Sequence, residues 1–150
     1  MGKILLVDDE PNIRLLYKEL LNDEGYEVLE AETGKASFDI LRREPIDLVV
    51  LDIKLRLESG LDVLQNLTKE FPSLPVILCS AYASFQDDYI SWLAEAYIVK
   101  SSDTEELLKV IKKILNKKRK TEGNTPVTEA EMKQEEDLQI VSTNHLMKST

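Results

Sequence analysis

The stretch DLVVLDIKLRLESG, residues 47–60, joins an apolar segment to an acid. The unbroken apolar run from Leu48 to Leu51 predicts a strand buried on both faces, as strands of parallel sheets usually are. The run ends on a carboxylate, Asp52, where the chain leaves the predicted strand. A strand that only filled the core would not need an ionisable residue at its end. Asp52 is therefore the first candidate for a functional residue.

Short apolar segments alternate with amphipathic segments on both sides of this stretch. The predicted strands are residues 3–7, 26–31, 47–52, 75–81 and 96–100. The predicted helices are residues 11–24 with Gly25 as the stop, a helix from a Thr33 cap to before Pro45, residues 60–71, residues 85–95, and a last helix capped by Asp103. Apolar residues recur at helical spacing in the first helix (Ile13, Leu16, Leu20), and the fourth helix carries Ile90, Trp92 and Leu93.

This alternation predicts the α/β fold class. Parallel strands need long crossovers, and helices of this length supply them. We expect a doubly wound, five-stranded parallel sheet of order 2-1-3-4-5, covered by helices on both faces as a three-layer sandwich. The weaker, alternating pattern of residues 26–31 places that strand near the edge of the sheet.

Composition narrows the class of protein further. The chain has 150 residues and a formal charge of −9, with a pI near 4.7. This acidity argues against direct binding of nucleic acid, which needs a basic surface. No apolar run approaches the ~18 residues of a membrane span, and the amino terminus reaches acids too early for a signal peptide. We expect a cytoplasmic protein without membrane insertion. The one cysteine, Cys79, lies in an apolar run and is expected to be a buried thiol.

The chain changes character near residue 118. Residues 1–118 are predicted to form one domain, and residues 119–150 a polar, flexible tail with at most a short helix over 128–138. The only histidine, His145, lies in this tail without a chemical partner nearby in the sequence. We interpret the tail as inert or as a linker, with a docking segment as the alternative.

Polar residues lie at the ends of four of the predicted strands. Asp8 and Asp9 follow the first strand, Asp52 and Lys100 end the third and the fifth, and Ser80 lies near the end of the fourth. In a parallel sheet these ends meet at one edge, where ligands bind. Clustered carboxylates repel each other unless a cation compensates, and oxygen ligands suit Mg²⁺. A carboxylate nucleophile beside a metal ion, a lysine and a hydroxyl fits phosphoryl transfer.

Each of these residues also has a structural interpretation. Asp9 could cap the first helix, Ser80 could start a turn, and Lys100 could be a solvated surface charge. The combination of suitable residues after four strands favours a functional site.

The motifs VDDE, LDIK with Gly60 eight residues beyond Asp52, CSA and AYIVK resemble the receiver domain of bacterial two-component response regulators. The resemblance covers about residues 3–116. It implies a signalling switch that catalyses only its own phosphorylation and dephosphorylation, rather than an enzyme. It also implies a histidine kinase or phosphotransfer protein as the donor, and a downstream protein target.

The resemblance assigns a role to each matching residue. Asp52 would be the phosphoacceptor. Asp9, Asp52 and the backbone carbonyl of Lys54 would bind Mg²⁺, with Asp8 acting through water. Lys100 would pair with the phosphoryl group, while Ser80 and Tyr97 would report it as switch residues. The surface of the fourth helix, fifth strand and last helix would then bind a partner or a second copy of the chain.

Three departures from the family pattern concern the loops. Arg56 stands where the family usually has proline, four residues after the phosphoacceptor. Ser101 follows Lys100 in place of a cis proline, and a cis bond there would cost about 2.5–4 kcal/mol. The interval from Ser80 to Lys100 is about two residues short, so we expect a short or displaced fourth helix.

Two other classes of function remain as alternatives. One is a phosphorylation-independent interaction module with the same fold. The other is an aspartate-nucleophile hydrolase, which the sequence disfavours because Lys54 stands where that class needs a second acid.

Overall fold

The computed structural model describes residues 2–81, 89–100 and 104–122. The strands are β1 (Lys3–Val7), β2 (Glu27–Ala31), β3 (Leu48–Asp52), β4 (Val76–Ser80) and β5 (Ala96–Val99). The α-helices in the described residues are α1 (Pro11–Asp23), α2 (Gly34–Arg43), α3 (Gly60–Glu70) and α4 (Glu105–Glu122), and a short 3-10 helix, η2, spans Tyr89–Leu93. Strands and helices alternate along the chain as predicted.

The five strands form one parallel sheet of order β2-β1-β3-β4-β5. This confirms the predicted fold class and strand order, including the edge position of β2. The register pairs Val7 with Leu51 and Asp52 with Cys79, so the carboxyl ends of β1, β3 and β4 lie side by side. The acids that follow β1 and end β3 are therefore neighbours.

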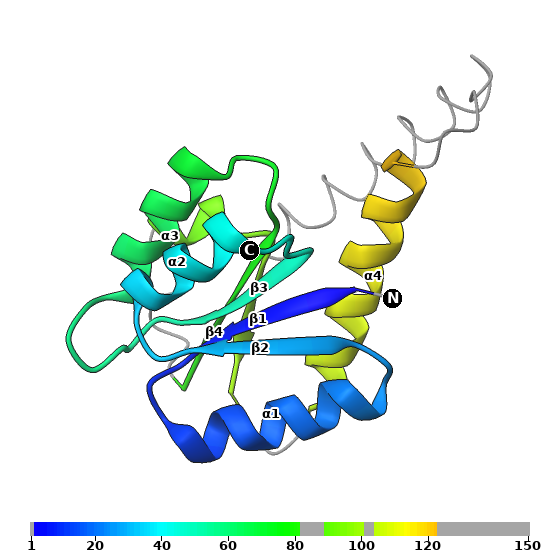
Figure 1. Ribbon diagram of the computed structural model, residues 1–150, viewed down its shortest axis with the longest axis horizontal. Helices are drawn as coiled ribbons and strands as arrows, with labels where there is room; N and C mark the ends of the chain where they lie inside the picture. The colour runs from blue at the N-terminus through cyan, green and yellow to red at the C-terminus, as the bar shows by residue number, and fades with distance from the viewer. Residues whose placement is uncertain (1, 82–88, 101–103, 123–150) are drawn as a thin grey trace. The chain divides into compact units, whose positions relative to one another are not determined.

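The three inner strands, β1, β3 and β4, bury both of their faces. In β3, Val49 and Leu51 belong to one hydrophobic cluster, and Leu48 and Val50 belong to a second. The first cluster includes side chains of α2 and α3, and the second includes side chains of α1 and α4. Figure 1 shows the same three layers, with α2 and α3 on one side of the sheet and α1 and α4 on the other. This two-sided burial accounts for the unbroken apolar runs.

The helix predicted over residues 85–95 is wrong in its described part. Residues 82–88 lie outside the described residues, and Tyr89–Leu93 forms η2 instead of an α-helix. The backbone N–H of Glu95 donates to the carbonyl of Val76 at 2.8 Å, so the chain has already joined the sheet at that residue. Trp92 and Leu93 are 73% and 48% exposed rather than packed inward.

The buried stripe of α1 also differs from the predicted one. Leu16 is 52% exposed, whereas Tyr17 and Leu21 are buried in the second cluster. Ile13 is partly buried against the same cluster, so the inward positions are spaced by four residues from 13. The helix is rotated by about one residue relative to the expected stripe.

Several predictions fall outside the described residues. These are the Asp103 cap, the Lys100–Ser101 peptide, the helix over 128–138 and His145. Helix α4 extends to Glu122, past the predicted domain boundary at residue 118, and that boundary stays a prediction. None of the helices among the described residues is long and apolar enough to cross a membrane.

Candidate functional site at the carboxyl edge of the sheet

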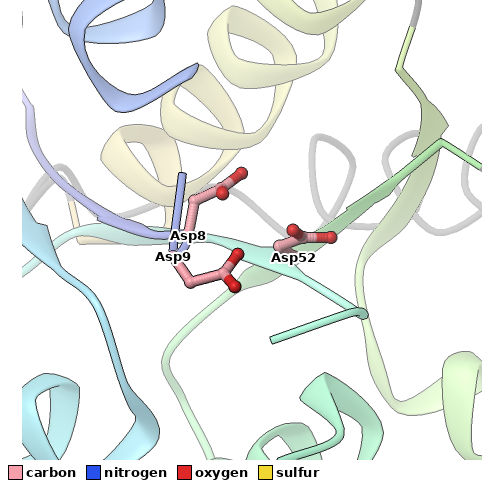
Figure 2. A group of neighbouring side chains, drawn as sticks. All are labelled: Asp8, Asp9 and Asp52. Atoms are coloured by element: carbon pink, nitrogen blue, oxygen red, sulfur yellow. The ribbon is translucent and has the colours of Figure 1, made fainter. Parts of the chain in front are cut away.

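Three carboxylates meet where β1 and β3 end. One carboxylate oxygen from each of Asp8, Asp9 and Asp52 lies within 4.8 Å of the others. Asp8 and Asp52 are buried, with 6% and 5% of their surface exposed, whereas Asp9 is half-buried. Figure 2 shows Asp8 and Asp9 extending from the end of one strand beside Asp52 on the next. The parallel topology thus brings together the acids that the sequence predicted to meet.

Lys100 lies between two of these acids. Its Nζ is 2.8 Å from Asp8 Oδ2 and 3.1 Å from Asp52 Oδ2, and only 14% of its side chain is exposed. Its backbone N–H donates to the carbonyl of Ser80 at 2.6 Å, which holds the residue at the end of β4. Lys100 is therefore a member of the acid cluster and not a solvated surface charge.

The charges of the cluster shift the pKa of Lys100 upward. Burial alone would lower this pKa, but the hydrogen bond and charge of Asp8, together with the charge of Asp52, outweigh it. The ammonium group consequently stays protonated at neutral pH.

Asp52 is an acid in an unfavourable environment. Burial is the main reason that its pKa is raised, and the charge of Asp8 raises it further. The charge of Lys100 and a hydrogen bond from the Lys54 N–H to Oδ1, 3.2 Å long, act in the opposite direction. The pKa remains raised because burial and the charge of Asp8 together outweigh the stabilisation that Lys100 and the Lys54 N–H provide.

Asp8 is held by the beginning of α1. Its Oδ1 accepts the Glu10 N–H at 2.9 Å, and its backbone carbonyl accepts a bond from Arg14 Nη1 at 2.6 Å. The cap residue of α1 is Glu10, which makes no side-chain capping bond, so Asp9 is not the helix cap. Arg14 also pairs with Glu30 in β2 and with Glu32 directly after it. Arg14 is not among the residues predicted from the sequence, where its only signal is a positive charge one turn into the helix that follows the acids.

Ser80 and Tyr97 lie on the neighbouring strands. Ser80 ends β4 one residue beyond Cys79, the partner of Asp52 in the register, and it is completely buried. Tyr97 pairs with Leu78, two positions before Ser80, and is partly buried against the first hydrophobic cluster. Ser80 therefore lies at the carboxyl edge on the strand next to Asp52, and Tyr97 lies one strand further along, set back from that edge.

The loop after Asp52 is held without the usual proline. Lys54 and Ser59 form an antiparallel bridge, and Leu55 is buried in the first cluster, while Arg56 is exposed. The N–H of Gly60 donates to the carbonyl of Ile53 at 2.6 Å. The loop is thus a closed hairpin, and it returns the chain to the end of β3.

The donor set fits Mg²⁺. Three carboxylates and one ammonium carry a formal charge of −2 when all are ionised, because three negative charges meet one positive charge. Hard oxygen ligands at one or two carboxylates are what Mg²⁺ prefers. The nearby Cys79 is a poor competing ligand, because burial raises the pKa of its thiol to about 11. The cluster of Asp8, Asp9 and Asp52 could hold such an ion.

Comparison with known proteins identifies the class to which this fold and site belong. The family described as response regulator receiver domain matches residues 4–112. The chain belongs to this family of receiver domains, which are signalling switches of two-component systems rather than enzymes in the usual sense.

Individual relatives agree with this assignment. Sporulation initiation phosphotransferase F of Bacillus subtilis is 34% identical over 75% of this chain and 93% of the relative. The crystal structure of the response regulator TrrA from Thermotoga maritima, in complex with Mg²⁺-BeF, is 43% identical. It covers 76% of this chain and 99% of TrrA, with a TM-score of 0.74. TrrA has also been solved in complex with the histidine kinase ThkA (77% and 99% covered, TM-score 0.73).

Other curated relatives are longer than the matched region. The chain spans about half of the Escherichia coli transcriptional regulatory protein CpxR, with 36% identity over 78% of this chain.

Proposed function

We propose that Asp52 accepts a phosphoryl group from a phosphohistidine donor in an Mg²⁺-dependent reaction. The observation that carries the proposal is the position of Lys100 Nζ, within 3.1 Å of both Asp8 and Asp52 inside the acid cluster. A buried carboxylate beside a fixed ammonium and a cation site is suited to phosphoryl transfer, in which charge on the transferred oxygens must be neutralised.

The reaction is a displacement at phosphorus. An oxygen of Asp52 forms a bond to phosphorus as the bond from phosphorus to the donor nitrogen breaks, and the nitrogen keeps the electron pair. Lys100 remains protonated and would pair with a phosphoryl oxygen, while Ser80 would donate its hydroxyl to another. Mg²⁺, held by Asp9, Asp52 and the Lys54 carbonyl, with Asp8 acting through water, would supply further neutralising charge.

The donor is proposed from the relatives. TrrA forms a complex with a histidine kinase, and another relative is named a phosphotransferase. A histidine kinase or phosphotransfer protein is therefore the expected source of the phosphoryl group.

The output is proposed to be a change in a protein-binding surface. Ser80 and Tyr97 would couple the phosphoryl group to η2, β5 and α4. Large apolar side chains are exposed on η2 and β5: Trp92 is 73%, Leu93 48% and Val99 37% exposed. Such a patch suits a protein partner, either a downstream target or a second copy of the chain. Phosphorylation would act by its different affinity for two conformations of this surface.

The test is direct phosphorylation in the presence of a small-molecule donor. Wild-type protein is incubated with Mg²⁺ and acetyl phosphate and weighed by mass spectrometry, with an EDTA control. We expect an adduct with the mass of one phosphoryl group, which is absent in Asp52→Asn and in EDTA. An unmodified wild type would instead support the phosphorylation-independent interaction module, and an adduct that persists in Asp52→Asn would refute the role of Asp52.

A further inference from the structure

The structure assigns a positioning role to Glu58, a residue without a part in the proposed chemistry. We propose that its carboxylate fixes the hairpin Lys54–Ser59 to the start of α2, and so holds the backbone of Lys54 in place for Mg²⁺ binding. This inference rests on the proposed function, because Lys54 matters there as a metal ligand.

Glu58 makes a contact between segments far apart in the sequence. Its Oε1 accepts the backbone N–H of Gly34 at 3.0 Å, across 24 residues. Gly34 is the first residue of α2, after the Thr33 cap, whose side chain accepts the N–H of Ala36 instead. The Gly34 N–H is one of the helix-end donors that lack a partner within the helix, and the helix dipole favours an anion there. The carboxylate of Glu58 satisfies both requirements.

The fit at this contact depends on glycine. A Cβ atom at position 34 would overlap Glu58 Oε1 and would lie 2.8 Å from Val63 Cγ2. The space above α2 is therefore filled by Glu58, which leaves no room for a side chain on Gly34.

The contact is linked to Asp52 through two backbone steps. Ser59, the residue after Glu58, pairs with Lys54 across the hairpin and also accepts the Leu61 N–H as the cap of α3, at 3.2 Å. Lys54 in turn donates its N–H to Asp52. Glu58 and Ser59 thus bind the first turns of α2 and α3. The hairpin that contains them also carries the Lys54 backbone, which faces the proposed phosphoacceptor, Asp52. With Arg56 in place of proline, this attachment restrains the loop from outside.

The experiment compares Glu58→Ala, Glu58→Gln and a matched control, Asp62→Ala. Asp62 is an exposed acid in the first turn of α3, and its side chain has no hydrogen bond or ion pair among the described residues. The Mg²⁺ dissociation constant is measured by calorimetry on the full chain, and the exchange of the Gly34 and Lys54 amides is measured by NMR without metal.

We expect Glu58→Ala to raise the Mg²⁺ dissociation constant about tenfold, the usual effect of losing a residue that orients a metal ligand. Both amides should exchange faster in that variant. Glu58→Gln keeps a hydrogen-bond acceptor and should stay within about threefold of wild type, while Asp62→Ala should match wild type.

Two results would overturn the inference alone. One is an Mg²⁺ affinity that is unchanged in Glu58→Ala, even if urea denaturation shows that this variant is less stable. The other is a loss of Mg²⁺ affinity in Asp62→Ala as large as the loss in Glu58→Ala. A wild type that binds no Mg²⁺ would overturn the proposed function together with this inference, so the two failures are distinguishable.

Discussion

At the residue scale, Asp52 combines burial with a second carboxylate at its side. Lys100 is shared between Asp8 and Asp52, so one cation serves two buried anions. A protein that used Asp52 only for stability would gain from a neutral residue, because burial disfavours the ionised carboxylate even beside Lys100. The arrangement is instead suited to receiving additional positive charge.

The raised pKa of the Asp52 carboxyl determines how the stability of the fold depends on pH. When the folded-state pKa of an acid lies above its ordinary value, 3.8 for Asp52, its ionised form costs stability at neutral pH. The cost disappears as the pH falls through the folded-state pKa toward the ordinary value. In EDTA at pH 7 we expect Asp52→Asn to be more stable than wild type by on the order of 1 kcal/mol.

Urea denaturation at several pH values between 7 and 4 checks this expectation. The difference between the two proteins should shrink as the pH falls, and an exposed control, Asp62→Asn, should show no such trend. A variant less stable than wild type at neutral pH would contradict the prediction.

At the scale of elements, the sequence predicts strands better than helix orientations. Each inner strand is an unbroken apolar run buried on both sides, so its pattern has only one interpretation. Helix α1 instead carries apolar side chains at five of seven successive positions (Leu15, Leu16, Tyr17, Leu20, Leu21). Two inward stripes, one residue apart, fit this pattern equally well, and packing against the sheet selects Tyr17 and Leu21.

The residues of the site also differ in how well the sequence predicts them. Acids at strand ends are predictable because parallel topology brings those ends together. Arg14 and Glu58 are not, because the ion pairs of Arg14 and the hydrogen bond of Glu58 join segments whose approach no local pattern reports. Arg56 in place of the family's proline indicates that the loop is unusual. That Glu58 restrains this loop can be inferred only from the three-dimensional structure.

The junction of β3 with α3 gives a prediction at this scale. A Cβ on Gly60 would overlap the Asp52 carbonyl oxygen and lie 2.7 Å from Ile53 Cα. Both are backbone atoms that cannot move without displacing Asp52. We expect Gly60→Ala to destabilise the fold by about 2–4 kcal/mol in urea denaturation, within the range of severe single substitutions.

Gly2→Ala is the matched control. A Cβ on Gly2 would meet the flexible end of the Leu115 side chain, which can move aside, so we expect a loss below about 1 kcal/mol. Equal losses for the two variants would show that close backbone packing at Gly60 is not what matters.

At the scale of the whole molecule, the fold and the ion should stabilise each other. A ligand that binds only the folded state adds about 2.7 kcal/mol of stability at 100 times its dissociation constant. We expect Mg²⁺ to raise the thermal midpoint of wild type, and the rise to be lost in Asp9→Asn.

General screening of the chain's −9 charge must be separated from specific binding. Thermal unfolding in NaCl of matched ionic strength provides that control. A rise of equal size in NaCl would contradict a specific site.

The hairpin Lys54–Ser59 also has an evolutionary consequence. Because Glu58 and Ser59 bind two different helices, inserting or deleting one residue would break at least one attachment. The tip of the hairpin, Arg56 and Leu57, does not hold a helix in this way. Arg56 is exposed and Leu57 is 84% exposed. Selection can therefore vary the chemistry of the tip while its length stays fixed. A substitution at Arg56 or Leu57 can therefore change a surface contact near Asp52 without breaking either attachment.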